Sequence, residues 1–158
     1  MDANFSARAK DVITFSREEA IRLGNDYLGV EHILLGIIRE GEGLAIRILN
    51  EFHINLKELR HELERSLKET SVKRIKSTNI PLVRQAEKVL KITYLEARLF
   101  KSKRVGTEHI LLAILREEDN IATNLLNKYG VIYDNVKEEL EEMLEEKNIP
   151  RAEFPGST

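Results

Sequence analysis

The sequence predicts an all-α fold, an eight-helix bundle made of two tandem four-helix repeats related by a pseudo-twofold axis. Three observations lead to this prediction. Leu, Ile, Glu, Lys and Arg dominate the 158 residues and only three prolines occur, a composition typical of helical proteins. Apolar residues recur at helical spacing. When the chain is shifted by 77 residues, residues 5–67 align with 82–144 without a gap and 20 of the 63 positions are identical, which indicates a tandem duplication.

The first repeat carries a start or stop signal for each of its helices. Ser6 is a good N-cap for the first helix, and Gly24-Asn25-Asp26 ends it. The run at 33–38 is apolar on nearly all sides, which is typical of a buried central helix. Asn55 with Glu58 resembles a capping box. The predicted helices of this repeat cover residues 7–23, 30–41, 43–52 and 56–67.

The second repeat follows the same plan. Thr107 is expected to cap the helix that follows Gly106, and Asp134 to cap the last helix. The join between the repeats is polar and basic, and Pro81 suits the start of the next helix. The sequence therefore predicts one domain over residues 1–147, with repeat one at 5–67, a linker at 68–80, repeat two at 82–144 and a flexible linker at 148–158.

Charge and composition exclude several function classes. The net charge of -2 argues against binding nucleic acid through a general positive charge. The chain has no cysteine, which excludes disulfides, thiolate catalysis and cysteine zinc sites. The longest apolar runs are far shorter than the roughly 20 residues that span a bilayer, and no signal peptide is recognised. We therefore expect a cytoplasmic protein with no membrane and no nucleic-acid partner.

A GxEH motif occurs once in each repeat and is the recurring polar feature of the chain. It places Glu31 and Glu108 in the first turn of equivalent helices. One interpretation is electrostatic, since a carboxylate there complements the exposed N–H groups. The other is a site for a zwitterionic group, in which the carboxylate binds a guanidinium or ammonium and the N–H groups bind an anion. Two copies would make a bivalent surface.

The histidines of the motifs do not point to a metal. His32 and His109 are adjacent to the glutamates, and neighbouring helical residues point about 100° apart, which disfavours one shared ion. We expect no metal site and two half-buried histidines, each with one nitrogen satisfied. His53 and His61 have no counterparts in the other repeat and are expected at the surface.

No catalytic motif is found in the sequence. GxSxG, GxGxxG and the GxxxxGK[ST] phosphate loop are all missing, so no catalytic residue, no cofactor and no ATP in a Walker site are expected in this chain. An acid/base pair of Glu31 and Glu108 remains open as the basis of a small helical enzyme. Repeat symmetry argues against that pair, because equal surroundings do not split two pKa values.

The segments FSARAKDVITFSREEAIRLG (5–24), GVEHILLGIIREGEGLAIRIL (29–49) and GTEHILLAILRE (106–117) resemble the N-terminal Clp repeat domain of AAA+ Clp protein unfoldases, most closely the ClpC type. The resemblance implies an eight-helix binding domain that is not itself an enzyme. It also implies adaptor proteins and protein substrates as partners, delivery to the ClpP protease by the full-length unfoldase, and ATP only in ATPase rings beyond Thr158. The alternative is a stand-alone Clp-repeat adaptor or decoy without an ATPase.

The resemblance also implies candidate binding residues for phosphoarginine, which marks proteins for degradation in some members. The family's two pockets use the motif glutamates, here Glu31 and Glu108, and a hydroxyl at the start of the first helix of each repeat. Ser6 supplies that hydroxyl in the first repeat, whereas Val83 has none in the second. We therefore expect a working site at Ser6 and Glu31, a weaker or missing one at Val83 and Glu108, and otherwise a surface for adaptors alone.

Overall fold

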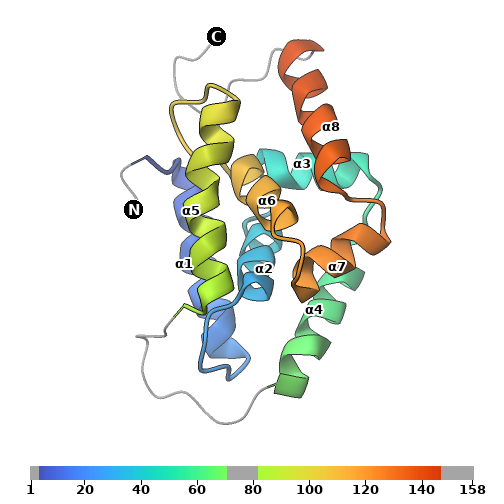
Figure 1. Cartoon of the computed structure of the whole chain (residues 1–158). Coiled ribbons are helices and arrows are strands. Elements are labelled where there is room, and N and C mark those ends of the chain that lie inside the picture. The colour runs from blue at the N-terminus through green and yellow to red at the C-terminus, as the bar shows by residue number, and fades with distance from the viewer. Residues whose placement is uncertain (1–3, 71–81, 147–158) are drawn as a thin grey trace.

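The computed structural model describes residues 4–70 and 82–146, and the predicted all-α architecture is confirmed there (Figure 1). The order and number of helices are those predicted, and α4 continues three residues beyond the expected end at 67. Predictions for most of the join, for Pro81 and for the tail after 147 lie outside the described residues. The helices are α1 Ala7–Arg22, α2 Val30–Glu40, α3 Leu44–Glu51, α4 Leu56–Thr70, α5 Arg84–Leu99, α6 Thr107–Arg116, α7 Ile121–Lys128 and α8 Tyr133–Glu146.

Two of the predicted helix caps are confirmed and two are wrong. The Ala9 N–H donates to Ser6 Oγ over 3.1 Å, and the Glu58 N–H donates to the side chain of Asn55 over 3.0 Å. Thr107 lies inside α6, and Gly106 is the N-cap. The hydroxyl oxygen of Thr107 instead accepts from the Ala45 N–H of the other repeat over 3.1 Å. A contact between the repeats therefore uses the hydroxyl that the predicted cap would have used.

The other wrong cap is at the start of α8. Asp134 is the second residue of that helix. The first turn closes through a bond from the Val136 N–H to the Ile132 carbonyl oxygen over 2.9 Å. An acidic residue within the first turn still complements the helix dipole, so Asp134 acts there rather than as a cap.

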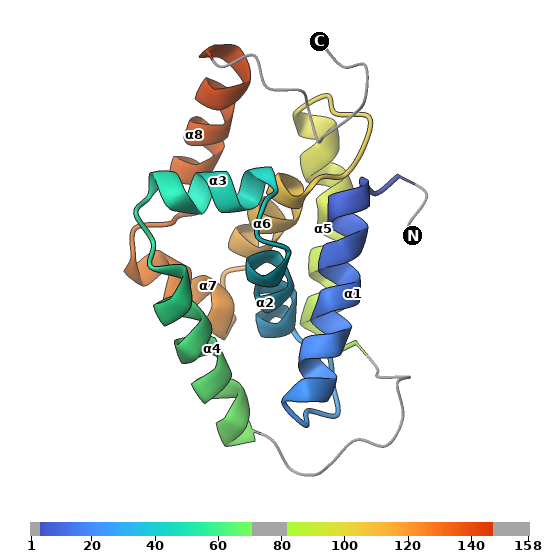
Figure 2. The ribbon, with the colours of Figure 1, turned by 180° about the vertical axis from the view of Figure 1, so that it is seen from behind.

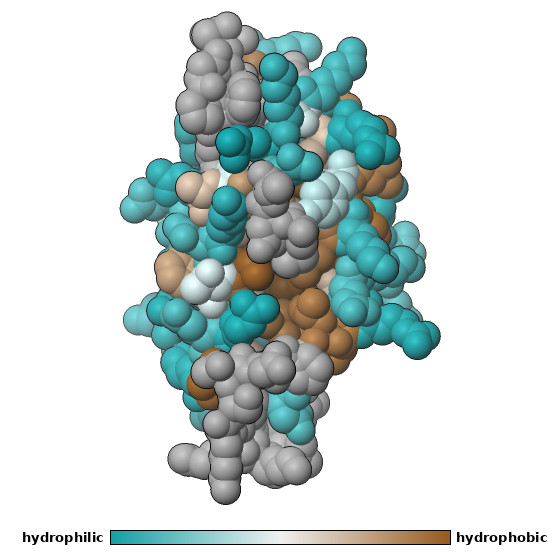
Figure 3. All heavy atoms as spheres, turned by 90° about the vertical axis from the view of Figure 1, so that its left-hand side faces the viewer, coloured by the Kyte–Doolittle hydropathy of each residue, from teal (hydrophilic) through white to brown (hydrophobic). Residues whose placement is uncertain are grey.

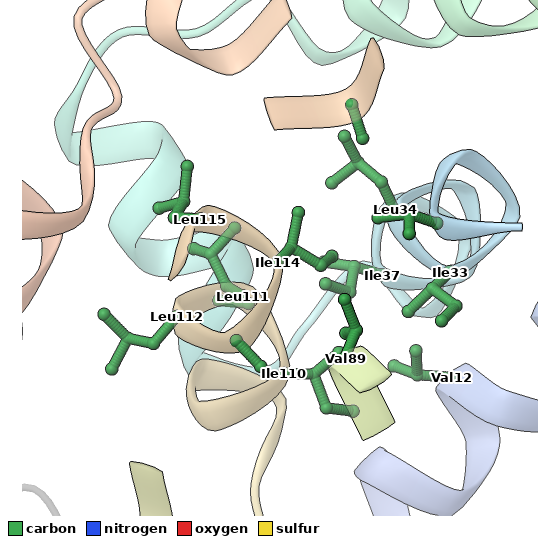
Figure 4. Close-up of a cluster of buried hydrophobic side chains, with 14 of the residues drawn as sticks. Val12, Ile33, Leu34, Ile37, Val89, Ile110, Leu111, Leu112, Ile114 and Leu115 are labelled. Atoms are coloured by element: carbon green, nitrogen blue, oxygen red, sulfur yellow. The ribbon is translucent and has the colours of Figure 1, made fainter. Parts of the chain in front are cut away.

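The core is centred on α2 and α6, the two helices that carry the GxEH motifs. Leu34 and Leu111 are both fully buried, as a central position predicts. Figure 4 shows Ile37 and Ile114 side by side between these helices, with Val89 of α5 next to them. Of the helices in the described ranges, none has the length and apolarity needed to cross a membrane.

Two short backbone bridges show the twofold relation between the repeats. Phe5 pairs with Val105, and Leu82 pairs with Leu28. The 77-residue shift converts one bridge into the other. Each repeat's first helix therefore begins against the segment that precedes the second helix of the other repeat, and α1 and α5 lie side by side (Figures 1 and 2).

Candidate recognition site

The two motif histidines hold the starts of α2 and α6. Nδ1 of His32 accepts from the Gly29 N–H, and Nδ1 of His109 accepts from the Gly106 N–H, each over 2.9 Å. Both side chains are fully buried rather than half-buried. Burial lowers the pKa of His32 to about 4 and that of His109 to about 3. Both are therefore neutral at pH 7 and act as fixed helix caps.

Three further observations concern the other histidines, metal binding and the second ring nitrogen of His32. His53 and His61 are exposed, as predicted. No group of three or more potential metal ligands is found among residues 4–70 and 82–146. The second nitrogen of His32 lies 2.8 Å from the side-chain oxygen of Asn25. Because Nδ1 accepts, Nε2 carries the proton and donates to Asn25, so both nitrogens are satisfied rather than one.

The two motif glutamates lie in the predicted first turns but in different surroundings. Glu31 is half-buried. Its pKa is raised overall, because burial raises it by more than a hydrogen bond from its own backbone N–H lowers it. A Cβ at Gly29 would lie 2.8 Å from Glu31 Oε1, so the glycine leaves room for the carboxylate to fold back over the helix start. This supports the electrostatic interpretation for Glu31. Glu108 is only 1% exposed, and its Oε2 lies 3.9 Å from His109 Nε2.

Ser6 lies at the Glu108 end of the molecule, not at the Glu31 end. The Ser6 N–H donates to the Val105 carbonyl oxygen over 2.9 Å, three residues before Glu108. The equivalent bond, from the Val83 N–H to the Leu28 carbonyl oxygen over 3.1 Å, is at the Glu31 end. The predicted combination of Ser6 with Glu31 is therefore wrong. The twofold axis exchanges the partners, and a linear alignment of the repeats does not show such an exchange.

The two glutamates do not share one site. Glu31 comes three residues after Leu28, whose bridge partner Leu82 lies just before α5 begins. Glu108 comes three residues after Val105, which lies beyond the end of α5. The 16 residues of α5 extend over about 24 Å. An acid/base pair of these carboxylates is not formed, and the enzyme interpretation loses its two proposed residues.

A basic cavity of about 410 Å³ lies at the Ser6–Glu108 end. Its lining includes Val105 and four cations, Arg98, Lys101, Lys103 and Arg104. The equivalent positions near Glu31 are Ile21, Gly24, Asp26 and Tyr27, which carry no positive charge. Sequence reasoning missed these cations, although the run KSKR at 101–104 was a visible signal. Their charge favours an anionic group at this end.

An apolar hollow lies on the face formed by α1 and α5. Figure 3 shows apolar surface gathered in the middle of this face, with polar side chains around it. A cavity of about 260 Å³ is lined by residues of α5 and by Leu82 just before it. Leu82, Leu90 and Tyr94 are its apolar members, and Glu87 and Lys91 are also in its lining. Exposed apolar surface with a polar rim is typical of protein-binding sites.

Residues 4–129 and 96–154 match the family described as Clp repeat (R) N-terminal domain. The chain belongs to this Clp N-terminal domain family. It is 36% identical over its whole length to the chaperone protein ClpC2, chloroplastic, of Arabidopsis thaliana, of which it covers 16%. It is also 36% identical over 144 residues, 91% of the chain, to the chaperone protein ClpB of Oceanobacillus iheyensis, of which it covers 17%.

The fold agrees with solved Clp N-terminal domains. The Hsp104 N-terminal domain from Candida albicans superposes with a TM-score of 0.74 over 94% of this chain and 95% of that chain, at 20% sequence identity. The chain spans about a sixth of the length of the curated relatives it matches. It is thus a Clp N-terminal domain, the kind of domain that Clp ATPase chaperones carry. The cytoplasmic location stays a prediction.

Proposed function

We propose that this Clp N-terminal domain receives adaptor proteins and protein substrates for an ATP-dependent unfoldase, which delivers the substrates to the ClpP protease. Family membership is the observation that carries the proposal. The apolar hollow on the α1–α5 face supports it, because unfolded segments and adaptor surfaces offer apolar side chains. ATP, the one expected cofactor, would be bound by ring domains and not by these residues. Nucleic acid and membranes are not among the proposed partners.

The finer proposal is a phosphoarginine site at Ser6 and Glu108. The bond from the Ser6 N–H to Val105 supports it by bringing the hydroxyl to the Glu108 end, beside the basic cavity. Glu108 would bind the guanidinium, and Ser6 with the cations of the cavity would bind the phosphate. Ser6 and Glu108 are each 1% exposed, so the side chains that cover them have to move, which lowers the affinity. Glu31 would contribute a second, weaker site at most.

An NMR titration of the isotope-labelled 158-residue chain with free phosphoarginine tests this site. Arginine and inorganic phosphate are the control ligands, and Glu108→Gln and Glu31→Gln are matched variants. We expect shifts at residues 4–9 and 103–109 that are lost in Glu108→Gln and kept in Glu31→Gln. Shifts confined to residues 28–33 would place the site at Glu31 instead. Equal shifts with phosphate alone would reduce it to an anion site, and no shifts at millimolar ligand would leave a surface for adaptors only.

The wider proposal is tested in the full-length protein. Removal of this domain is expected to slow ClpP-dependent degradation of adaptor-delivered substrates while the ATPase activity of the rings persists. The alternative of a stand-alone adaptor or decoy is not favoured, because the matched relatives are Clp chaperones about six times as long. Unchanged degradation after removal of the domain would contradict the receiving role.

A further inference from the structure

A groove of about 570 Å³ lies between the end of α5 and the length of α8. Both elements lie at the same end of the molecule in Figures 1 and 2. One wall contains Leu99, Phe100 and Lys101, and Leu99 is 54% exposed, more than any other large apolar side chain in the described ranges. The α8 wall is acidic apart from Leu144. Its acidic residues are Glu138, Glu141, Glu142 and Glu145.

Lys101 is the one cation in the lining of the groove, and it lies on the wall opposite the four carboxylates. Within residues 4–70 and 82–146, none of them forms an ion pair. They are spaced three or four residues apart on one helix face, an arrangement in which like charges destabilise the helix. A bound cation would relieve this repulsion.

The first repeat shows what occupies the equivalent place. The 77-residue shift aligns Leu99 with Arg22 and Glu141 with Glu64. Arg22 donates to Glu64 over 2.6 Å and to Glu19 over 2.8 Å. In repeat one, the end of the first helix therefore supplies its own cation to the acidic residue of the fourth helix.

Repeat two has lost this cation without losing the carboxylate. Leu99 cannot pair with Glu141, and Glu96, the counterpart of Glu19, is bound instead by Arg116 and Tyr133. The wall also becomes more acidic elsewhere. Glu142 and Glu145 stand where repeat one has an arginine and a lysine. An exposed leucine now lies beside four carboxylates that form no ion pair within residues 4–70 and 82–146.

We propose that this groove docks a basic, amphipathic segment of a partner protein. An arginine or lysine of the segment takes at Glu141 the place that Arg22 takes at Glu64, and an apolar side chain of the segment covers Leu99. The acidic residues extend from 138 to 145, about 10 Å along the helix, which matches two turns of a helical partner with cations at positions i and i+4. The proposal specifies the charge and amphipathic character of one protein partner. It rests on the proposed role of this domain in receiving proteins, but not on the Ser6–Glu108 site.

The test uses a synthetic 14-residue helical peptide with leucines on one face and arginines at i, i+4 and i+7. The same peptide with glutamates in place of the arginines is the control. Titrated into the labelled 158-residue chain, the basic peptide should shift residues 99–101 and 138–145, and the acidic peptide should not. Raising the salt from 0.1 to 0.5 M should weaken binding several-fold, because the carboxylates are exposed.

Leu99→Arg is the decisive variant, since it restores the arginine of repeat one. We expect it to weaken binding of the basic peptide at least tenfold while the chain remains as stable as before. Glu141→Gln should also weaken binding, and the matched control Glu64→Gln should not. Undiminished binding to Leu99→Arg, or equal binding of the two peptides, would overturn the proposal.

Two further measurements distinguish other occupants and other failures. Sedimentation equilibrium of the chain, alone and as Leu99→Arg, tests whether a second copy covers Leu99. A dimer that the variant dissociates would assign the groove to self-association and overturn the proposal. The phosphoarginine titration repeated on Leu99→Arg should be unchanged, so loss of peptide binding with that response intact supports a separate docking site.

Discussion

The contact between α1 and α2 gives the sharpest test of the packing. Gly36 lies in α2 against α1, and a Cβ built there would lie well under 3.0 Å from the Val12 carbonyl oxygen and from Ser16 Oγ. Real Cβ atoms essentially never come that close. Ser16 Oγ also donates to the Val12 carbonyl oxygen over 2.6 Å. One obstacle is backbone, so Gly36→Ala forces the two helices apart.

The expected size of the effect follows from two opposing contributions. Overpacking of a tight core contact destabilises by about 1–3 kcal/mol. Alanine in place of glycine within a helix stabilises by about 1 kcal/mol. Because the obstacle includes a carbonyl oxygen, the first contribution should lie in the upper part of its range. We expect a net loss of about 1–2 kcal/mol, which lowers the Tm of a domain of this size by several degrees.

Repeat two supplies the control for this prediction, because Ala113 occupies the position equivalent to Gly36. The reverse change, Ala113→Gly, lacks an overpacking contribution. It should destabilise by about 2 kcal/mol, through helix propensity and the loss of a fully buried methyl group. Urea unfolding followed by circular dichroism at 222 nm measures both variants, with the m value unchanged. A Gly36→Ala chain as stable as the original, or more stable, would refute the close approach of α1 and α2.

Three further predictions concern the core and the helix starts. Leu34→Ala should destabilise by about 2–5 kcal/mol, because the side chain is fully buried; a loss under about 1 kcal/mol in urea unfolding would contradict its core position. Thr107→Val leaves the Ala45 N–H without its acceptor, and should cost about 1–3 kcal/mol and speed hydrogen exchange of that amide. Burial holds the pKa of His32 near 4 and that of His109 near 3, against about 6.5 in an unfolded chain. Between pH 6.5 and 4 the unfolded state binds more protons than the folded state, so the free energy of unfolding should decrease as the pH is lowered, by up to about 1.4 kcal/mol per pH unit for each histidine. The urea midpoint should therefore decrease from pH 7.5 to 4.5, and it should decrease less in His32→Gln.

The helices and the core were predictable because their causes are local or periodic. A gap-free repeat, apolar spacing and the caps at Ser6 and Asn55 are all properties of short stretches of sequence. The same local reasoning was wrong at Thr107. A hydroxyl next to a helix start looks like a cap, but here it accepts a hydrogen bond from Ala45 in the other repeat. That competing partner exists only once the two repeats pack together.

The candidate site was predictable in its residue types but not in their combination. The motif identified Glu31 and Glu108 as first-turn carboxylates, and the structure places both there. Whether Ser6 belongs with one or the other depends on which segment pairs with the start of α1. Two bonds decide it, from the Ser6 N–H to Val105 and from the Val105 N–H to Asn4. Such long-range backbone pairing leaves no periodic trace in the sequence.

The exchange of partners across the twofold axis also explains how the two ends of the molecule came to differ. Each end combines a first-helix start from one repeat with a GxEH helix from the other, so a substitution in one repeat changes one end only. Around the end of α5, the two flanks of the helix carry opposite charges. Arg98, Lys103 and Arg104 line the cavity on one flank, whereas α8 presents glutamates across the groove on the other. Lys101 lines both. A partner that carries both an anionic and a cationic group would therefore bind this end in one orientation, which a uniformly charged surface would not impose.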